Sequence, residues 1–197
     1  MDKRVAAMNA EVDSVQAVHE RDKAIKDEIR VTQQDTAFGR LLFGTDRKAA
    51  YAMKVELAGE TGFIDIGRCS YYFKMLFNEE YSLYRVELSG LTEHANHIDG
   101  KVLDCTRNLA NAIERKYGPA DTKNSEPKFF DYKPGKMQVM YVWDIGTKHI
   151  QVGIHEKSSG SEYSAEAWIW DTPMQEAVWK SNDAATSAEQ SDASKKF

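Results

Sequence analysis

The sequence contains no long apolar run: the longest falls far short of the roughly 18 residues that a membrane-spanning helix needs. The first residues, Met1 to Met8, lead into charged sequence and lack the apolar stretch of a secretory signal. We therefore expect no transmembrane segment and, by default, a cytoplasmic location. The alternative is the periplasm or the cell envelope, which applies if the chain is a processed form.

Excess positive charge is also missing. The chain carries 26 lysines and arginines against 31 aspartates and glutamates, which gives a formal net charge of −5. The basic residues are scattered, whereas binding to nucleic acids or to anionic membranes depends on clustered positive charge. This balance predicts no nucleic-acid partner and gives no sign of a polybasic membrane anchor.

Motifs of catalysis and of cofactor binding are absent too. The chain has no Gly-x-Ser-x-Gly nucleophile turn and no glycine-rich phosphate loop. Ser158, Ser159 and Ser161 lie in a Ser/Gly-rich segment that is typical of a surface turn. We therefore predict no cofactor and favour a protein that is not an enzyme.

Only two cysteines are present, Cys69 and Cys105, and their spacing matches no metal-binding motif. Cys105 falls on the apolar face of a predicted helix, which favours a small buried side chain. A disulfide with Cys69 is the alternative, because the sequence does not give the distance between the two residues.

Apolar residues are plentiful enough for one core, since 42% of the chain is hydrophobic and 11% is aromatic. Residues 1–35 are predicted as a long charged helix and a joint, because no Gly or Pro interrupts residues 3–31 and apolar residues recur every three or four positions. Such a narrow stripe predicts a coiled-coil seam that forms a homo-oligomer, or a helix packed on a surface. Residues 38–180 form the predicted single domain, and the Ser- and Ala-rich residues 181–197 a disordered tail.

Within that domain, alternation of apolar and polar residues predicts strands at residues 70–77, 82–89, 137–144, 148–156 and 162–170. Helices are predicted over residues 46–58 and 100–117, with a short one over 173–179. Residues 137–144 are apolar on both sides and are expected in the centre of the sheet. The predicted fold class is α+β: an antiparallel sheet of about five to six strands with two helices packed on one face, preceded by the long N-terminal helix.

Three short runs add a resemblance to a known class of protein. They are Phe43–Ala50 (FGTDRKAA), Leu83–Leu88 (LYRVEL) and Lys116–Pro119 (KYGP). The chain resembles, over about residues 40–171, small uncharacterised α+β modules of bacteria, often gut bacteria and sometimes associated with the cell envelope. The resemblance implies this fold class and implies no activity.

The sheet face that the helices would leave uncovered mixes aromatic and charged residues. Trp168 and Trp170 alternate with core positions of their strand, so both point away from the core. Exposed aromatic rings beside charged residues are typical of binding surfaces. We predict a binding or interaction module whose protein or small-molecule partner lies on this face, unless the N-terminal helix or a second subunit covers it. The candidate binding residues are Trp168, Trp170, Tyr72, Arg85, Glu166 and His155.

Two other functions stay open. His94 and His97 stand three residues apart in a predicted loop and could hold a metal ion, which would favour a small metal-assisted hydrolase. A pair with this spacing is more often two surface histidines. The last alternative is a structural coiled-coil protein that assembles through its N-terminal helix.

Overall fold

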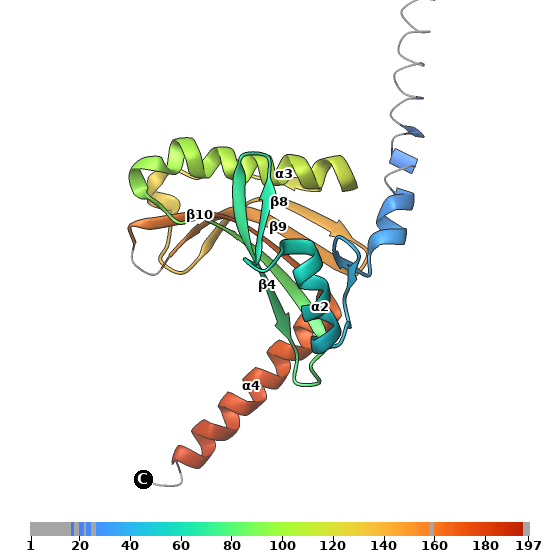
Figure 1. Ribbon diagram of the computed structural model, residues 1–197. Coiled ribbons are helices and arrows are strands. Elements are labelled where there is room, and N and C mark those ends of the chain that lie inside the picture. The colour runs from blue at the N-terminus through green and yellow to red at the C-terminus, as the bar shows by residue number, and fades with distance from the viewer. Residues whose placement is uncertain (1–16, 18–19, 22, 25–26, 158–159, 195–197) are drawn as a thin grey trace, which may run out of the picture.

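The structure is a computed structural model that describes residues 17, 20–21, 23–24, 27–157 and 160–194. It has an α+β fold built on one eight-stranded antiparallel sheet, whose strand order is β3-β4-β5-β10-β9-β8-β7, with β6 pairing to β10 (Figure 1). The strands of this sheet are β3 (Phe63–Ile66), β4 (Cys69–Phe77), β5 (Leu83–Gly90), β6 (Glu93–His94), β7 (Thr122–Lys123), β8 (Met137–Ile145), β9 (Lys148–Glu156) and β10 (Glu162–Asp171).

Smaller elements surround the sheet. The strands β1 (Thr36–Phe38) and β2 (Leu41–Leu42) form a separate two-stranded ribbon. The helices are α2 (Arg47–Ala58), α3 (Leu103–Tyr117) and α4 (Thr172–Ser194), with short helical turns η1 (Ala95–His97), η2 (Ile98–Val102) and η3 (Phe129–Asp131). No helix in the described ranges is both long and apolar enough to cross a membrane.

The prediction of five to six strands is wrong because three strands of the sheet are short. The five long predicted strands are present as β4, β5, β8, β9 and β10, whereas β3 has four residues and β6 and β7 have two each. So few residues cannot show an alternating pattern. The short strands are positioned by pairing with neighbouring strands of the sheet.

The expected central position of residues 137–144 is also wrong. The strand order places β8 second from one edge and β10 in the middle. The pairing of β8 with β9 is irregular between Val139 and Tyr141, where a bulge shifts the side-chain alternation. Opposite this bulge stands Gly153, at which a Cβ atom would lie only 2.1 Å from the carbonyl oxygen of Gln138. The bulge therefore explains why this strand is apolar on both faces without being central.

The prediction of a long N-terminal helix is a third correction. Among the described residues the continuous helical stretch covers only residues 27–33, and residues 1–16, which hold the first part of the expected coiled-coil stripe, lie outside the described residues. Residues 27–33 contact the domain through Ile29, which packs against the core, and through Arg30, whose guanidinium pairs with Asp121 at 2.8 Å. This stretch therefore belongs to the domain's own packing.

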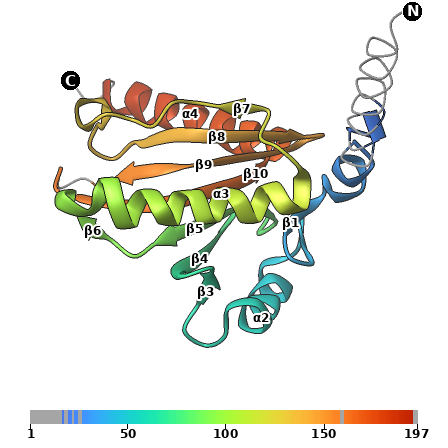
Figure 2. The ribbon, with the colours of Figure 1, turned by 90° about the horizontal axis from the view of Figure 1, so that it is seen from above.

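The core lies between the sheet and its helices on one face. Tyr71 and Phe73 of β4 are fully buried, and the Tyr71 hydroxyl donates to the Cys105 carbonyl of α3 at 2.7 Å. Figure 2 shows α3 across the sheet and α2 beside the β3 and β4 edge. Leu109 of α3, which has no exposed surface, contributes about 2 kcal/mol through burial of its side chain.

Helix boundaries follow local capping. Asp46 precedes α2, and its carboxylate accepts the backbone N–H groups of Lys48 and Ala49, as an N-cap residue does. Gly118 closes α3 at a positive φ of 82°, and its N–H donates to the Glu114 carbonyl. The start of α3 differs from the prediction, because the π-helical turn η2 precedes it.

At the C-terminal end, α4 runs from Thr172 to Ser194, where the sequence predicted a helix over 173–179 and a disordered tail from residue 181. The helix begins on the side of the sheet away from α3 and then diverges from it (Figure 1). Ser181 is still attached to the domain, since its hydroxyl donates to Glu79 at 2.6 Å.

The two cysteines form a disulfide, so the expectation of a buried free thiol is wrong and the alternative is correct. Cys69 begins β4 and Cys105 lies in the first turns of α3, with their Cα atoms 5.7 Å apart. This distance is within the usual range for a disulfide. The bond fastens the end of β4 to the helix that covers the sheet.

Candidate functional site

The face of the sheet opposite α3 carries a continuous polar and aromatic surface, which we call the polar face. Successive strand residues point to opposite sides, so alternate positions of β4, β5, β10 and β9 share it. The strand register aligns these positions in rows across the sheet. The rows are Tyr72–Ser89–Glu166, Lys74–Glu87–Trp168–Gln151 and Arg85–Trp170–His149.

All six candidate binding residues of the sequence lie on this polar face. Five of them, Trp168, Trp170, Arg85, Glu166 and His155, form a connected group on β5, β9 and β10. The sixth, Tyr72, stands on β4 near the sheet edge, 43% exposed, with the ring of Phe63 5.7 Å away. Their role in binding stays a prediction.

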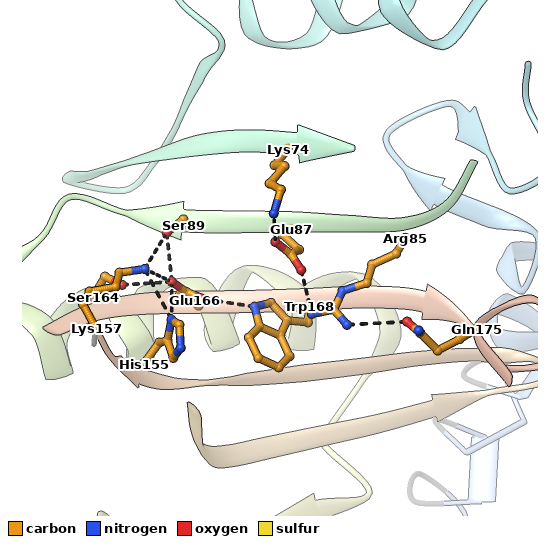
Figure 3. A network of polar contacts seen from close by, with 10 residues as sticks. All are labelled: Lys74, Arg85, Glu87, Ser89, His155, Lys157, Ser164, Glu166, Trp168 and Gln175. Atoms are coloured by element: carbon orange, nitrogen blue, oxygen red, sulfur yellow. Dashed lines mark hydrogen bonds and ion pairs between the residues drawn. The ribbon is translucent and has the colours of Figure 1, made fainter. Parts of the chain in front are cut away.

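Glu166 is the centre of the polar face. Its side chain is almost fully buried, yet five groups donate hydrogen bonds to its two oxygens (Figure 3). The Oε1 atom accepts from Ser89 at 2.9 Å, from Ser164 at 3.0 Å, from His155 at 3.0 Å and from the Lys157 ammonium group. The Oε2 atom accepts from the Trp168 indole at 2.8 Å.

The surroundings of Glu166 stabilise its charged form. Burial by itself raises the pKa of the carboxyl group, but the hydrogen bonds from His155 and Lys157 and their positive charges outweigh burial and lower the pKa to about 2. The same hydrogen bond raises the pKa of His155. Glu166 is therefore an anion over the whole range in which proteins usually act.

This electrostatic setting does not suit Glu166 to act as a general base. A general base is effective when its pKa lies near the working pH, and a carboxylate with a pKa of about 2 holds protons too weakly to remove one from a serine. The hydroxyls of Ser89 and Ser164 already donate to this carboxylate, and Lys157 is paired with it. The arrangement is suited to holding the polar face in one shape.

The two tryptophans are held by neighbours on both sides. The Arg85 guanidinium carbon lies 4.4 Å from the Trp168 ring centre and 5.7 Å from that of Trp170. The His149 ring stands 4.4 Å from the Trp170 ring. Arg85 in turn donates to the side chain of Gln175 in α4 at 3.4 Å. Both indoles are partly exposed, and cation–π contacts fix their orientation.

The predicted metal ligands do not come together into a site. His94 in β6 accepts the backbone N–H of Asn96 at 3.5 Å, and His97 lies in η1; both side chains are exposed. Across the described ranges, no three His, Cys, Asp or Glu side chains are placed to hold one ion. The structure thus gives the metal-assisted hydrolase no support.

Sequence reasoning missed several partners of the polar face. Glu87 was placed on this face by the strand pattern of the sequence, whereas Ser89, which alternates with the core residues of β5 in the same way, was not. Lys157 follows the last residue of β9, and Gln175 belongs to a helix far along the chain, so no local pattern marks either one.

Compared with known proteins, the chain matches no family model, no curated protein and no solved structure.

Proposed function

We propose that this chain is a non-enzymatic binding module and that its partner docks on the polar face. The observation that carries the proposal is the pair Trp168 and Trp170, partly exposed side by side on the central strand, on the face away from α3. Aromatic anchors bind well when their orientation is fixed before the partner arrives, because less side-chain entropy is then lost.

The rest of the polar face supports the same reading. Lys74, Glu87 and Gln151 flank Trp168 across the strands, which surrounds an aromatic centre with polar groups. Glu87 forms ion pairs with both Lys74 and Arg85, so the charged groups of this area are held by one another. A binding surface of this kind selects partners by shape and hydrogen bonding more than by net charge.

The first test measures whether the tryptophans are accessible in solution. Iodide and acrylamide quenching of indole fluorescence would be compared in the wild type, Trp168→Phe, Trp170→Phe and Trp179→Phe. Trp179 is 54% exposed on α4 and serves as the accessible reference, whereas Trp143 is fully buried. The fluorescence that disappears when Trp168 or Trp170 is replaced is the emission of that tryptophan. We expect this emission to be quenched less than that of Trp179 and more than that of Trp143.

The second test is a screen of peptide and glycan arrays with the wild type, Trp170→Ala and Trp179→Ala. Trp170 is chosen because Trp168 donates to the buried Glu166 and its removal would disturb the network. We expect ligands that Trp170→Ala loses and Trp179→Ala keeps. Shielded tryptophans, or array signals that both variants keep equally, would count against the polar face as the binding surface.

We also propose that the module works in an oxidising compartment, such as the periplasm or cell envelope. The Cys69–Cys105 disulfide supports this, because structural disulfides persist outside the reducing cytoplasm and are rare within it. The test is alkylation of the protein in cells of its source before lysis. We expect Cys69 and Cys105 to carry no alkyl group when the protein is denatured and analysed. Alkylation of both thiols would place the protein in a reducing compartment.

A further inference from the structure

A surface hollow of about 450 Å³ lies between the β4–β5 turn and the first turns of α4, and we call it the hairpin hollow. Its lining comes from two stretches, residues 77–84 of the hairpin and residues 174–182 of the helix. Figure 1 shows this turn beside the start of α4, where the helix leaves the sheet. The hollow is thus a different part of the surface from the polar face.

Hydrogen bonds hold the two walls of the hairpin hollow in place. In the turn, the Asn78 side chain accepts the backbone N–H of Glu80 at 3.1 Å. The Ser181 hydroxyl of α4 donates to the Glu79 carboxylate at 2.6 Å, which joins the helix directly to the turn. A partner therefore meets a hollow that already has its shape, and less conformational entropy is lost on binding.

Part of the lining of the hairpin hollow is apolar. Phe77, Met174 and Val178 are each partly exposed there, next to the buried ring of Tyr84. A partner that covered these side chains would remove apolar surface from water, which is favourable. The hollow can thus hold apolar side chains of a partner.

The lining also carries negative charge. Glu79 and Glu80 both line the hollow and both are exposed. Within the described residues neither glutamate forms an ion pair. Two adjacent carboxylates therefore face the solvent beside the apolar side chains.

The basic residues of the neighbourhood do not neutralise these carboxylates. Lys74 and Arg85 both pair with Glu87 on the polar face. Arg47 lies against three aromatic rings and forms no ion pair in the described part of the chain. Lys180 points away, because 3.6 residues per turn place it on the opposite side of α4 from the helix residues that line the hollow.

We propose that the hairpin hollow binds a segment of a partner protein that combines basic and apolar side chains. Nucleic acids and anionic membranes carry phosphates, so the two carboxylates repel both. A neutral glycan would leave Glu79 and Glu80 without a counter-charge. A basic polypeptide supplies that charge, and its lysine or arginine stems and apolar side chains cover Phe77 and Val178. The formal net charge of −5 attracts such a segment from a distance.

The test measures the fluorescence anisotropy of a short labelled peptide, in which arginines alternate with leucines, as the full chain is added at low salt. Two comparison peptides have glutamine in place of arginine or serine in place of leucine. We expect each comparison peptide to bind about tenfold more weakly, because each lacks one of the two contacts. Added salt should weaken binding of the arginine–leucine peptide, since ions screen exposed charge pairs.

Two variants locate the binding in the hairpin hollow. Glu79→Gln/Glu80→Gln should weaken binding of the arginine–leucine peptide about tenfold, since each exposed ion pair is worth about threefold. The glutamine at position 79 keeps an oxygen that accepts from Ser181, so the walls stay joined. Val178→Ala should weaken binding about fivefold through lost apolar contact, and alanine suits the helix.

The matched control is Glu60→Gln/Glu176→Gln, which removes the same charge at two exposed glutamates away from the hollow and should bind as the wild type does. Equal weakening by the two double variants would overturn the proposal, because net charge alone would then explain binding. Equal affinity for the three peptides, or no binding, would also overturn it. So would a wild type that sediments as a dimer and a Glu79→Gln/Glu80→Gln variant that sediments as a monomer, which would assign the hollow to a second copy of the chain.

Discussion

Glu166 shows how a single buried charge can organise a surface. An ionised carboxylate without partners would be too costly to bury, and five donors from three strands and from Lys157 replace the water that it loses. Each donor is fixed in turn, because it must point at the same two oxygens. The rigidity of the polar face therefore follows from the needs of one residue.

Replacement of Glu166 by Gln should destabilise the protein by about 3 kcal/mol near neutral pH. The amide carries no charge for His155 and Lys157, and its NH₂ group is a donor where the site needs an acceptor. Chemical denaturation of wild type and variant measures the difference, and NMR titration should show the pKa of His155 falling in the variant.

The contribution of the Glu166 carboxylate to the free energy of unfolding has a defined pH dependence. Because the folded-state pKa of Glu166 is about 2 and its ordinary value is 4.5, its stabilising contribution is complete above pH 4.5 and is lost as the pH falls toward 2. The stability gap between wild type and Glu166→Gln should therefore close in acid. A gap of constant size would show that the carboxylate's charge is not what the network needs.

At this scale the sequence indicated which side chains share a face but not what they do there. A period of two placed Trp168, Trp170 and Glu166 together because it depends only on the strand's geometry. The burial of Glu166 depends on Lys157 and on Ser89 of a neighbouring strand, which are contacts distant in sequence. For the same reason the partial cover of Arg85 by Gln175 of α4 could not be predicted.

Elements were predictable where a periodic pattern runs long enough. The strands β4, β5, β9 and β10 and the ends of α2 and α3 at glycines agree with the sequence, because alternation and capping are local. The strands β3, β6 and β7 have no pattern of their own. The β4–β5 turn shows a different limit: Tyr81 adopts a positive φ of 60°, a conformation usual for Gly, and the side chain of Asn78 supports the turn by accepting two backbone N–H groups.

The link between β4 and α3 gives the element-scale prediction. The disulfide closes a loop with a sequence separation of 36 residues, and the chain-entropy relation assigns such a closure about 4 kcal/mol. Reduction, or the double variant Cys69→Ala/Cys105→Ala, should lower the free energy of unfolding by that order. Denaturant titration with and without reductant measures it.

The hydrogen bond of Tyr71 provides a control for the prediction about the disulfide. Its hydroxyl donates to the Cys105 carbonyl, so β4 and α3 retain one contact at the same place when the disulfide is open. We therefore expect the reduced protein to keep its native circular dichroism at low denaturant. An unfolding free energy that does not change on reduction would mean that the bond adds no constraint beyond this packing.

At the scale of the whole molecule, Lys148 joins three parts of the chain. It begins β9, and its side chain, 1% exposed, reaches the carbonyls of Gln33 and Thr36 and the hydroxyl of Tyr117 at the end of α3. None of these partners carries a negative charge. Burial, assisted by the charge of Lys116 and opposed by Asp35, lowers the pKa of Lys148 to about 7.

This buried lysine makes alkaline stabilisation the final prediction. Between about pH 7 and 10.5 the unfolded chain keeps the proton on Lys148 while the folded chain has released it, so the free energy of unfolding rises with pH. Above pH 10 the buried tyrosines reverse the trend. Burial raises the pKa of Tyr71, and that of Tyr117 to about 12, so only the unfolded chain ionises them there.

The expected profile is therefore a maximum of stability on the alkaline side of neutrality, with falling stability in acid as Glu166 becomes protonated. Lys148→Met removes the titrating group, so the advantage of the wild type over this variant should grow by several kcal/mol from near-neutral to alkaline pH. Urea denaturation of both proteins across this range measures the difference. An advantage that stays constant with pH would show that the Gln33 and Thr36 carbonyls and the Tyr117 hydroxyl keep the lysine charged in the folded protein.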